Sequence, residues 1–184
     1  MIHLVLGKQG EGKTIYLCKV AFDFYKKGKT VYSNIALNFP YEKLNYQDII
    51  DCKLKDGVVI LDEIHLLLPA RMSMRKININ ICDGFLSMCR KKQLDVYGST
   101  QLSRKVDVRF REESDYIYVC EKLALLNKKL VKIMHNQNLE KEIDIYIKLD
   151  ITETYSGNMI TKSFKANKYF DMYNTKEIIK IEGI

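Results

Sequence analysis

The sequence lacks the patterns that identify zinc-binding, membrane-spanning and exported proteins. Its five cysteines include no CxxC pair and its three histidines are scattered, so the ligand spacing of a zinc site is absent. No uninterrupted apolar run approaches the roughly 20 residues that a membrane helix needs, and no basic segment followed by an apolar one opens the chain. We therefore expect a soluble protein of the cytoplasm, whose cysteines are reduced and buried.

The chain also lacks internal repeats, low-complexity segments and flexible linkers. Its 184 residues suffice for one α/β domain but not for two full-sized ones. Hydrophobic residues make up 47% and charged residues 29%, values near the globular average that exclude a disordered chain. The 12 tyrosines form no spaced platform on which single-stranded nucleic acid would stack. A single folded domain is the resulting prediction.

Arginine is absent from most of the chain. Lysine and arginine outnumber aspartate and glutamate by 30 to 23, and the charge of +7 is compatible with a polyanionic partner but small for a protein that coats DNA. All the arginines lie between residues 71 and 111. Because a guanidinium offers a planar fork of donors for phosphates and carboxylates, this segment is a candidate for recognising such groups. The arginines are Arg71, Arg75, Arg90, Arg104, Arg109 and Arg111.

The beginning of the chain has the pattern of a strand, a glycine-rich loop, a helix and a second strand. An apolar run at 2–6 ends at a glycine, and an apolar stretch at 15–25 ends in two lysines and a glycine at 26–28. The run at 30–35 is the next strand. This pattern predicts a βαβ unit with parallel strands.

Later segments continue the α/β pattern. The apolar run 58–61 shows no alternation, which is typical of a strand covered on both faces. Apolar residues from 79 onward recur at three- and four-residue spacing, so we expect an amphipathic helix that runs to the basic residues 90–92. A short helix is predicted at 46–52, and strands at 94–100 and 116–120.

The pattern changes after about residue 126. Apolar and polar residues alternate from 143 to 152, which is the period of a half-exposed antiparallel strand, and turn residues at 127–128 and 156–158 flank it. We therefore predict an α/β core at 1–126, followed by a β-rich extension of the same domain at 127–184.

The segment GKQGEGKT fits the pattern G-x-x-x-x-G-K-[ST] of a loop that cradles nucleotide phosphates. It lies between a predicted strand and a predicted helix, as such a loop requires. The expected ligands are ATP and Mg²⁺, with Lys13 reaching the outer phosphates and Thr14 binding the metal. The predicted nucleotide-binding residues are Gly7, Lys8, Gln9, Gly10, Glu11, Gly12, Lys13 and Thr14.

Polar residues follow the later strands. Asp62 and Glu63 end the buried strand 58–61, at the sheet edge that also carries the phosphate loop. We expect Asp62 to hold Mg²⁺ and Glu63 to orient or deprotonate the attacking water. Gln101 follows the strand 94–100 and could contact both the γ-phosphate and that water, or it could be a polar strand end.

The basic residues allow two interpretations. Arg90 or Arg109 could reach a neighbouring subunit's γ-phosphate as an arginine finger, although a surface salt bridge explains either of them equally well. Arg71, Arg75 and Lys76 form a loop without acidic residues that could contact a DNA backbone or simply be solvated.

Four segments together resemble the FtsK/HerA superfamily of P-loop ATPases, in particular viral genome-packaging ATPases and the Zot-like proteins of filamentous phage. They are GKQGEGKT, VVILDEIHLLLPAR, FLSMCRKKQLDVYGSTQ and VDVRFREESDYIYV, and the resemblance covers residues 2 to about 120. It implies a RecA-like ASCE core with strand order 5-1-4-3-2 and a homo-oligomeric ring, usually hexameric, that pumps double-stranded DNA. It also implies the roles given above for Lys13, Thr14, Asp62, Glu63 and Gln101.

The leading functional prediction is therefore ATP-driven translocation of double-stranded DNA in viral genome packaging. A Zot-like ATPase for phage assembly or export is one alternative. Another is a nucleotide-gated assembly protein that docks on a capsid or membrane partner through residues 127–184. A small-molecule nucleoside kinase is a further alternative, but a water-activating glutamate suits a kinase site poorly.

Overall fold

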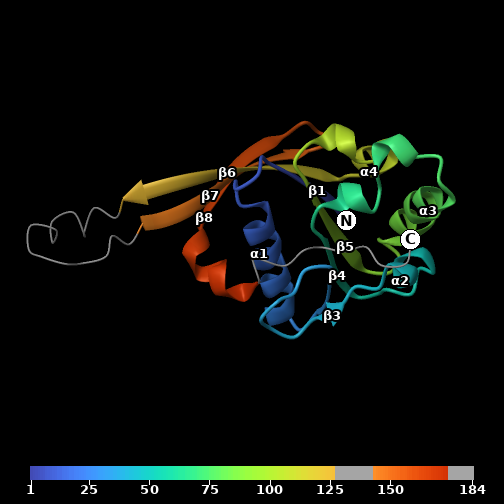
Figure 1. The fold of residues 1–184 in the computed structure, drawn as a ribbon, viewed down its shortest axis with the longest axis horizontal. Coiled ribbons are helices and arrows are strands. Elements are labelled where there is room, and N and C mark those ends of the chain that lie inside the picture. Colours follow the sequence, from blue (N-terminus) through green and yellow to red (C-terminus); the bar gives the residue numbers. More distant parts are fainter. Residues whose placement is uncertain (127–142, 174–184) are drawn as a thin grey trace, which may run out of the picture.

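The computed structural model describes residues 1–126 and 143–173 of the chain. Strands in these residues form one eight-stranded sheet with the order β3-β2-β4-β5-β1-β6-β7-β8 (Figure 1). The strands are β1 (Ile2–Leu6), β2 (Thr30–Ser33), β3 (Glu42–Lys43), β4 (Gly57–Leu61), β5 (Leu94–Thr100), β6 (Tyr116–Leu126), β7 (Ile143–Glu153) and β8 (Met159–Lys165).

The directions of the strands agree with the prediction. All neighbours from β3 to β6 pair in parallel, whereas β6 with β7 and β7 with β8 pair antiparallel. The order β6-β1-β5-β4-β2 is the 5-1-4-3-2 order that the family resemblance implies, with the two-residue strand β3 added at the sheet edge. The α/β class, the parallel core and the antiparallel C-terminal extension are therefore confirmed.

Helices cover both faces of the sheet. The α-helices are α1 (Lys13–Lys26), α2 (Tyr46–Ile50), α3 (Lys76–Ile79) and α4 (Val108–Glu112), and α3 continues into a π-helical segment, η3 (Asn80–Leu86). The 3₁₀ segments are η1 (Ile64–Leu66), η2 (Ala70–Met72), η4 (Ser103–Lys105) and η5 (Ala166–Met172). Figure 1 shows α1 and η5 on one side of the sheet, with α2, α3 and α4 toward the other.

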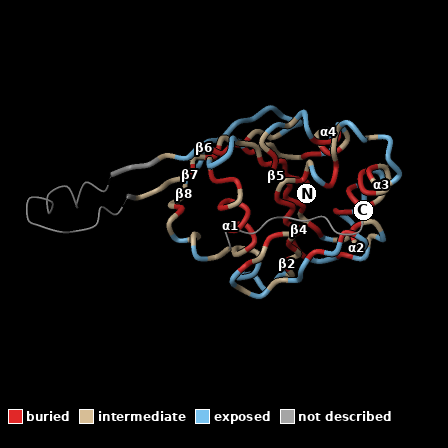
Figure 2. Tube along the Cα trace, viewed as in Figure 1, coloured by how far each residue is buried: buried red, intermediate tan, exposed pale blue. Residues whose placement is uncertain are grey.

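Two hydrophobic cores lie between these helices and the sheet (Figure 2). Leu17 of α1 packs in the first core with Val58 of β4, whereas Phe85 of η3 and Phe110 of α4 pack in the second core with Val59. Every residue of β4 is buried, as its uninterrupted apolar sequence predicts. This strand therefore has a fixed position between both layers.

The helix predicted at 79–92 begins and ends earlier in the structure than the sequence pattern indicates. Helical conformation begins at Lys76 and ends by residue 88, and the chain then turns through Gln93, which has a left-handed φ of 54°. The N–H of Leu94 bonds the carbonyl of Cys89 across this turn. The basic residues 90–92 therefore belong to the turn that leads into β5.

The C-terminal extension is built into the first core. Ile147, Leu149 and Ile151 of β7 are buried there together with Ala166 of η5. The turn between β7 and β8 contains Gly157 at a φ of 69°, near the predicted turn at 156–158. The other predicted turn, at 127–128, lies outside the described residues. Within the two described ranges, no helix is both long and apolar enough to cross a membrane.

Candidate active site

The carboxyl ends of three neighbouring strands meet at one edge of the sheet. β1 and β5 end side by side, with Leu6 opposite Thr100, and β4 ends beside Gly98 of β5. The phosphate-loop motif follows β1, the two adjacent carboxylates follow β4, and the half-exposed Gln101 follows β5. The fold therefore gathers these sequence-predicted groups at the same edge.

The phosphate-loop motif forms a tight turn between β1 and α1. Gly12 precedes the helix in the left-handed conformation, with a φ of 91°. The backbone N–H of Lys8 donates to Oε2 of Glu11 over 2.8 Å, and the ammonium of Lys13, a buried residue, donates to the Lys8 carbonyl over 3.2 Å. Because the first N–H groups of a helix lack intrahelical acceptors, the start of α1 offers donors and a positive dipole end to an anion.

Gly12 also contacts the C-terminal extension. A Cβ atom at this position would lie 2.2 Å from Cδ1 of Ile147, a fully buried side chain of β7. The backbone conformation and this close approach both require glycine. The extension therefore packs directly against the phosphate loop.

Thr14 and Asp62 connect the phosphate loop to β4. The Thr14 hydroxyl donates a hydrogen bond of 2.7 Å to Oδ2 of Asp62, whose side chain is buried. The second carboxylate oxygen, Oδ1, accepts hydrogen bonds from the Ser99 hydroxyl and from the backbone N–H of Glu63. Both oxygens of the carboxylate are thus fixed in position.

Asn34, which follows β2, holds the backbone of Asp62 from the other side. Its side-chain amide donates to the Asp62 carbonyl over 2.9 Å and accepts from the Asp62 N–H over 2.8 Å. Sequence reasoning missed Asn34 and Ser99, because a single polar residue near a strand end has no distinctive pattern. Their only signal is that they follow or end strands neighbouring β4.

Glu63 leaves the strand in the left-handed conformation, with φ and ψ of 52° and 49°. Its Oε2 atom is buried and accepts no hydrogen bond from the described part of the chain. This atom lies 3.2 Å from Nδ1 of His65, outside hydrogen-bond geometry. The left-handed backbone and the buried oxygen, which has no hydrogen bond within the described residues, distinguish Glu63 from a carboxylate that is only solvated.

The Thr14–Asp62 pair fits a magnesium ion. Hydroxyl and carboxylate oxygens are ligands that Mg²⁺ accepts, and in nucleotide sites this ion keeps several waters and substrate phosphates as its other ligands. The two described ranges contain no group of three or more His, Cys, Asp or Glu side chains that could hold a metal by itself. A site completed by phosphate oxygens is therefore the kind that these residues can form.

The two candidate arginine fingers occupy different environments. Arg90 is 79% exposed and pairs with Asp115 over 3.2 Å at the start of β6, at the edge of the sheet opposite the phosphate loop. Arg109 is largely covered, and its guanidinium makes a two-pronged contact with Asp107, with distances of 3.1 and 3.0 Å. Neither arginine contacts the phosphate loop of its own chain.

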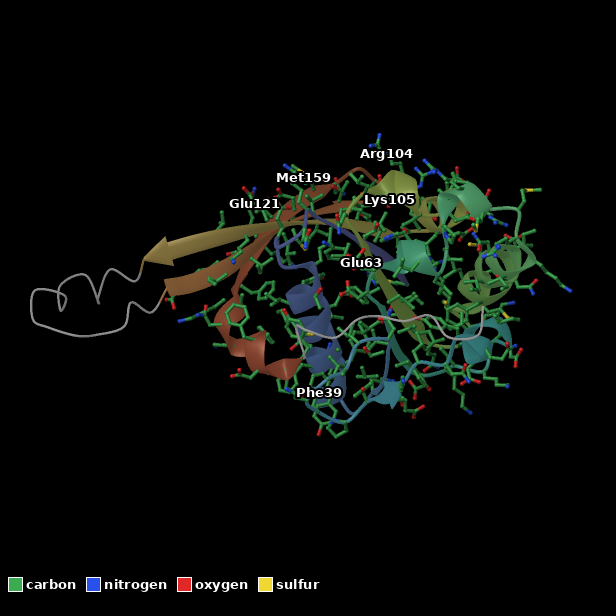
Figure 3. All side chains as sticks on the ribbon, in the orientation of Figure 1. Phe39, Glu63, Arg104, Lys105, Glu121 and Met159 are labelled. Carbon is green, nitrogen blue, oxygen red and sulfur yellow. The ribbon has the colours of Figure 1, made fainter. Side chains whose placement is uncertain are left out.

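Arg71, Arg75 and Lys76 are exposed on η2 and at the start of α3. A backbone bridge between Pro69 and Val106 brings η2 beside η4. Two further exposed cations, Arg104 and Lys105, belong to η4, and Figure 3 shows Arg104 pointing away from the body of the molecule. The loops after β4 and β5 thus form a joint cationic surface, which we call the η2–η4 surface.

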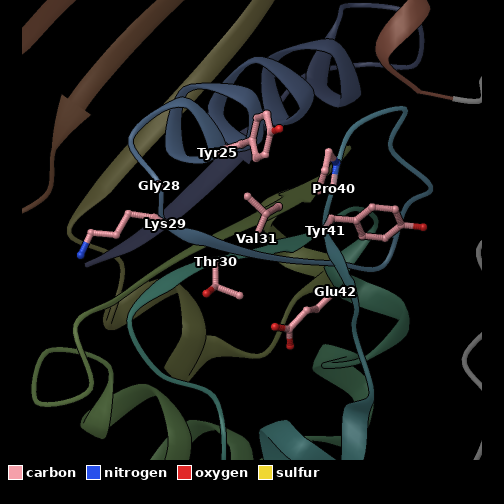
Figure 4. Close-up of a pocket in the computed structure, with 8 residues that line it drawn as sticks. All are labelled: Tyr25, Gly28, Lys29, Thr30, Val31, Pro40, Tyr41 and Glu42. Atoms are coloured by element: carbon pink, nitrogen blue, oxygen red, sulfur yellow. The ribbon is translucent and has the colours of Figure 1, made fainter.

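A separate cavity lies at the C-terminal end of α1, whereas the phosphate loop precedes the N-terminal end of this helix (Figure 4). Its volume is about 340 Å³, and its lining includes Tyr25, Tyr41, Pro40 and Glu42. None of the predicted site residues lines it. The cavity is therefore separate from the candidate active site.

A parallel sheet in this order, with a glycine-rich loop between its first strand and first helix, defines the P-loop NTPase fold. No protein-family model matches the sequence, and no curated protein matches it. Solved structures share the fold. The N-terminal domain of zonular occludens toxin from Neisseria meningitidis is 19% identical with a TM-score of 0.64, and the match covers 94% of this chain and 98% of that domain.

Two further structures have the same fold. The genome-packaging NTPase B204 of Sulfolobus turreted icosahedral virus 2, in complex with ATP-gammaS, is 14% identical with a TM-score of 0.56, over 87% of this chain and 95% of B204. The ATPase domain of G40P is 13% identical with a TM-score of 0.53, over 95% of this chain and 84% of that domain. The predicted resemblance to packaging and Zot-like ATPases is thus confirmed at the level of the fold.

Proposed function

We propose that this chain hydrolyses ATP and uses the energy to move double-stranded DNA, most specifically in viral genome packaging. The observation that carries the proposal is the 2.7 Å hydrogen bond between Thr14 of the phosphate loop and Asp62, which precedes Glu63. It supports the proposal because a hydroxyl and a carboxylate in contact are the oxygens that a nucleotide-bound Mg²⁺ would use. The shared fold with B204, which is a genome-packaging NTPase, supports the same assignment.

Each residue at the sheet edge has a separate role in this proposal. Lys13 and the first N–H groups of α1 bind the phosphates, while Thr14 and Asp62 hold Mg²⁺, which neutralises phosphate charge when bound. Glu63 accepts the proton of the attacking water, and its Oε2 atom accepts no hydrogen bond from the described residues that would compete with that water. Gln101 contacts the γ-phosphate from the end of β5.

The experiment is ATP hydrolysis by the purified protein with and without duplex DNA. We expect DNA-stimulated turnover that Glu63→Gln abolishes while nucleotide binding persists, and Lys13→Ala should remove binding itself. Wild-type protein without turnover, or Glu63→Gln with unchanged turnover, would contradict the proposal. Turnover that requires an added nucleoside would instead indicate a kinase.

In the same proposal the subunits form a ring, with ATP at the subunit boundaries and an arginine supplied by the neighbour. Arg90 is 79% exposed and its one ion pair in the described part of the chain is with Asp115, whereas withdrawing Arg109 would leave the buried Asp107 without its charged partner. Mixing Glu63→Gln subunits with Arg90→Ala subunits should restore part of the activity. A mixture of Glu63→Gln subunits with Arg109→Ala subunits is the comparison. If neither mixture recovers ATP hydrolysis, the proposal that a neighbouring subunit supplies the arginine is contradicted.

The second candidate function is a Zot-like assembly or export ATPase, or a nucleotide-gated assembly protein, with a capsid or membrane partner bound by residues 127–184. The observation in its favour is that the match to the Zot N-terminal domain covers nearly all of both chains. Deleting the extension would be a poor test, because Ile147 and its neighbours belong to the core.

Charged substitutions of Met159 and Ile160 are a better test of partner binding, because both side chains are exposed. This candidate would be favoured if a coat or membrane partner stimulates ATP hydrolysis and DNA does not. The stimulation by the partner should then be lost in these variants.

A further inference from the structure

A cavity of about 240 Å³ lies beside the phosphate loop. Most of its lining comes from the loop and the first turn of α1, but one wall is an aromatic side chain from the far end of the described chain. The lining residues are Gly10, Gly12, Lys13, Thr14, Ile15 and Tyr173. The phosphate-binding groups and an aromatic ring thus share one cavity.

Tyr173 is held in this position by the backbone. It forms an antiparallel bridge with Leu37, and the N–H of Asn38 donates to the carbonyl of Met172 over 2.9 Å. The preceding segment, η5, packs against α1, and Ala166 at its start is fully buried. The backbone of Tyr173 is therefore anchored to the loop after β2, at a position that lines the cavity beside the phosphate loop.

The Tyr173 hydroxyl is uncharged at neutral pH, like that of any tyrosine, and its environment raises the pKa further. Burial, with smaller contributions from Cys18 and Asp62, raises the pKa of the Tyr173 hydroxyl to about 12. A half-buried, uncharged ring presents an apolar surface next to a strongly polar loop. This combination suits a ligand with a charged end and a flat aromatic end.

We infer that Tyr173 is the nucleoside-binding wall of the active site and that a nucleobase stacks on its ring while the phosphate loop holds the phosphates. The inference rests on the proposed binding of ATP. Because every base has a π-face, a single stacked ring tolerates different bases, so binding should discriminate weakly among ATP, GTP and CTP.

This assignment gives the C-terminal extension a role within the active site. Ile147 of β7 packs against Gly12 on one side of the loop, and Tyr173 lines the cavity beside it. Both residues come from the part of the chain after 126, which the sequence assigns to an extension of the core. The extension thus completes a site whose catalytic groups all come from the core.

The test compares ATP with inorganic triphosphate, which has the phosphates but no base. Tyr173→Ala should weaken ATP binding about 5- to 150-fold, the range that corresponds to removal of one base–aromatic stack, and should leave triphosphate binding unchanged. Tyr173→Phe should bind both ligands as the wild type does. Equal weakening of both ligands by Tyr173→Ala, or a failure of Tyr173→Phe to bind ATP, would overturn the inference.

A second variant keeps the test decisive if Tyr173→Ala does not fold. The sequence contains no tryptophan, so Tyr173→Trp creates a single fluorescent reporter at the cavity. ATP should quench its emission and inorganic triphosphate should not. Tyr155→Trp, at a 75% exposed position between β7 and β8, is the matched control and should respond to neither.

The outcomes separate this inference from the proposed function. Wild-type protein that binds no ATP would refute the proposed function, and the inference with it. Normal ATP binding that is unchanged in Tyr173→Ala, or emission from Tyr173→Trp that ATP leaves unchanged, would refute the inference alone.

Discussion

The Thr14 hydroxyl donates a 2.7 Å hydrogen bond to the carboxylate of Asp62. These residues are 48 positions apart in the sequence, and the hydrogen bond joins the first turn of α1 to the end of β4. Ser99 holds the opposite oxygen of the same carboxylate, and Asn34 holds its backbone. The candidate metal ligands are thus positioned by three different strand ends before a nucleotide binds.

The first prediction concerns this pair. Asp62→Asn should lower the apparent Mg²⁺ affinity of ATP hydrolysis on the order of 10- to 100-fold, as removal of a group in a metal's coordination environment does. Thr14→Ala should act in the same direction, while Thr14→Ser keeps the hydroxyl and serves as the control. The measurement is hydrolysis rate against Mg²⁺ concentration at saturating ATP. An unchanged Mg²⁺ dependence in Asp62→Asn would show that the pair does not hold the metal.

The second prediction concerns Gly12. Gly12→Ala adds a methyl group to a left-handed residue and drives it into Ile147, so we expect the free energy of unfolding to fall by about 2–4 kcal/mol. Gly10→Ala is the control, because Gly10 is also left-handed at a φ of 80° but has no atom within 4 Å of the added carbon. It should be destabilised by only about 1 kcal/mol.

The double variant isolates the steric part of this effect. Ile147→Ala alone creates a cavity, but combined with Gly12→Ala it makes room for the added methyl group, so the double variant should be destabilised by less than the sum of the two single variants. Urea denaturation without nucleotide measures the wild type, the three single variants and the double variant. If the two single-variant changes in the free energy of unfolding simply add, the phosphate loop moves away from β7 without any loss of stability.

Most of the fold could be predicted from the sequence because its signals are local. The glycine-rich motif lies between strand and helix, β4 is apolar throughout, and β7 alternates with period two. The strand order came from the family resemblance, since no local pattern encodes which strands become neighbours. The predicted end of the helix before β5 was wrong by a few residues. The chain turns there through Gln93 in the left-handed conformation, and no glycine or proline in the sequence marks this turn.

The candidate site could be predicted only where its residues form a motif. The phosphate loop and the Asp62-Glu63 pair stand in recognisable patterns, and the sheet brings them to one edge. Asn34, Ser99 and Tyr173 are single residues whose positions depend on how distant segments pack. Their contacts are tertiary, so no spacing along the chain reveals them.

The third prediction concerns the buried Asp107. Burial alone would raise the pKa of this carboxyl, but hydrogen bonds from Arg109 and Asn78 outweigh burial and lower its pKa. A carboxyl with a lowered pKa in the folded state stabilises the protein fully above its unfolded pKa of about 3.9, and this stabilisation disappears as the pH falls through the folded value.

Asp107→Asn should therefore reduce the free energy of unfolding by about 1–3 kcal/mol at pH 7, and the difference from wild type should shrink below about pH 4. Urea titrations at a series of pH values measure both curves. Asp51→Asn is the control, because this carboxylate is at the surface and its Lys53 partner is well exposed. The quantity to follow is the difference in free energy of unfolding between the wild type and Asp107→Asn. If this difference stays constant down to about pH 2.5, well below the unfolded pKa, the charge of Asp107 contributes nothing to stability.

The fourth prediction concerns the η2–η4 surface. If duplex DNA binds there, replacing Arg71, Arg75 and Arg104 together by alanine should reduce the slope of log affinity against log salt by about 0.9 for each DNA phosphate that is no longer neutralised, and so by up to about 2.7. Removing Lys26, Lys27 and Lys29 subtracts the same charge at the far end of α1 and should change the slope little. Fluorescence anisotropy of a labelled duplex at several salt concentrations gives both slopes. Equal effects of the two triple variants would show that the protein attracts DNA through its net charge and not through this surface.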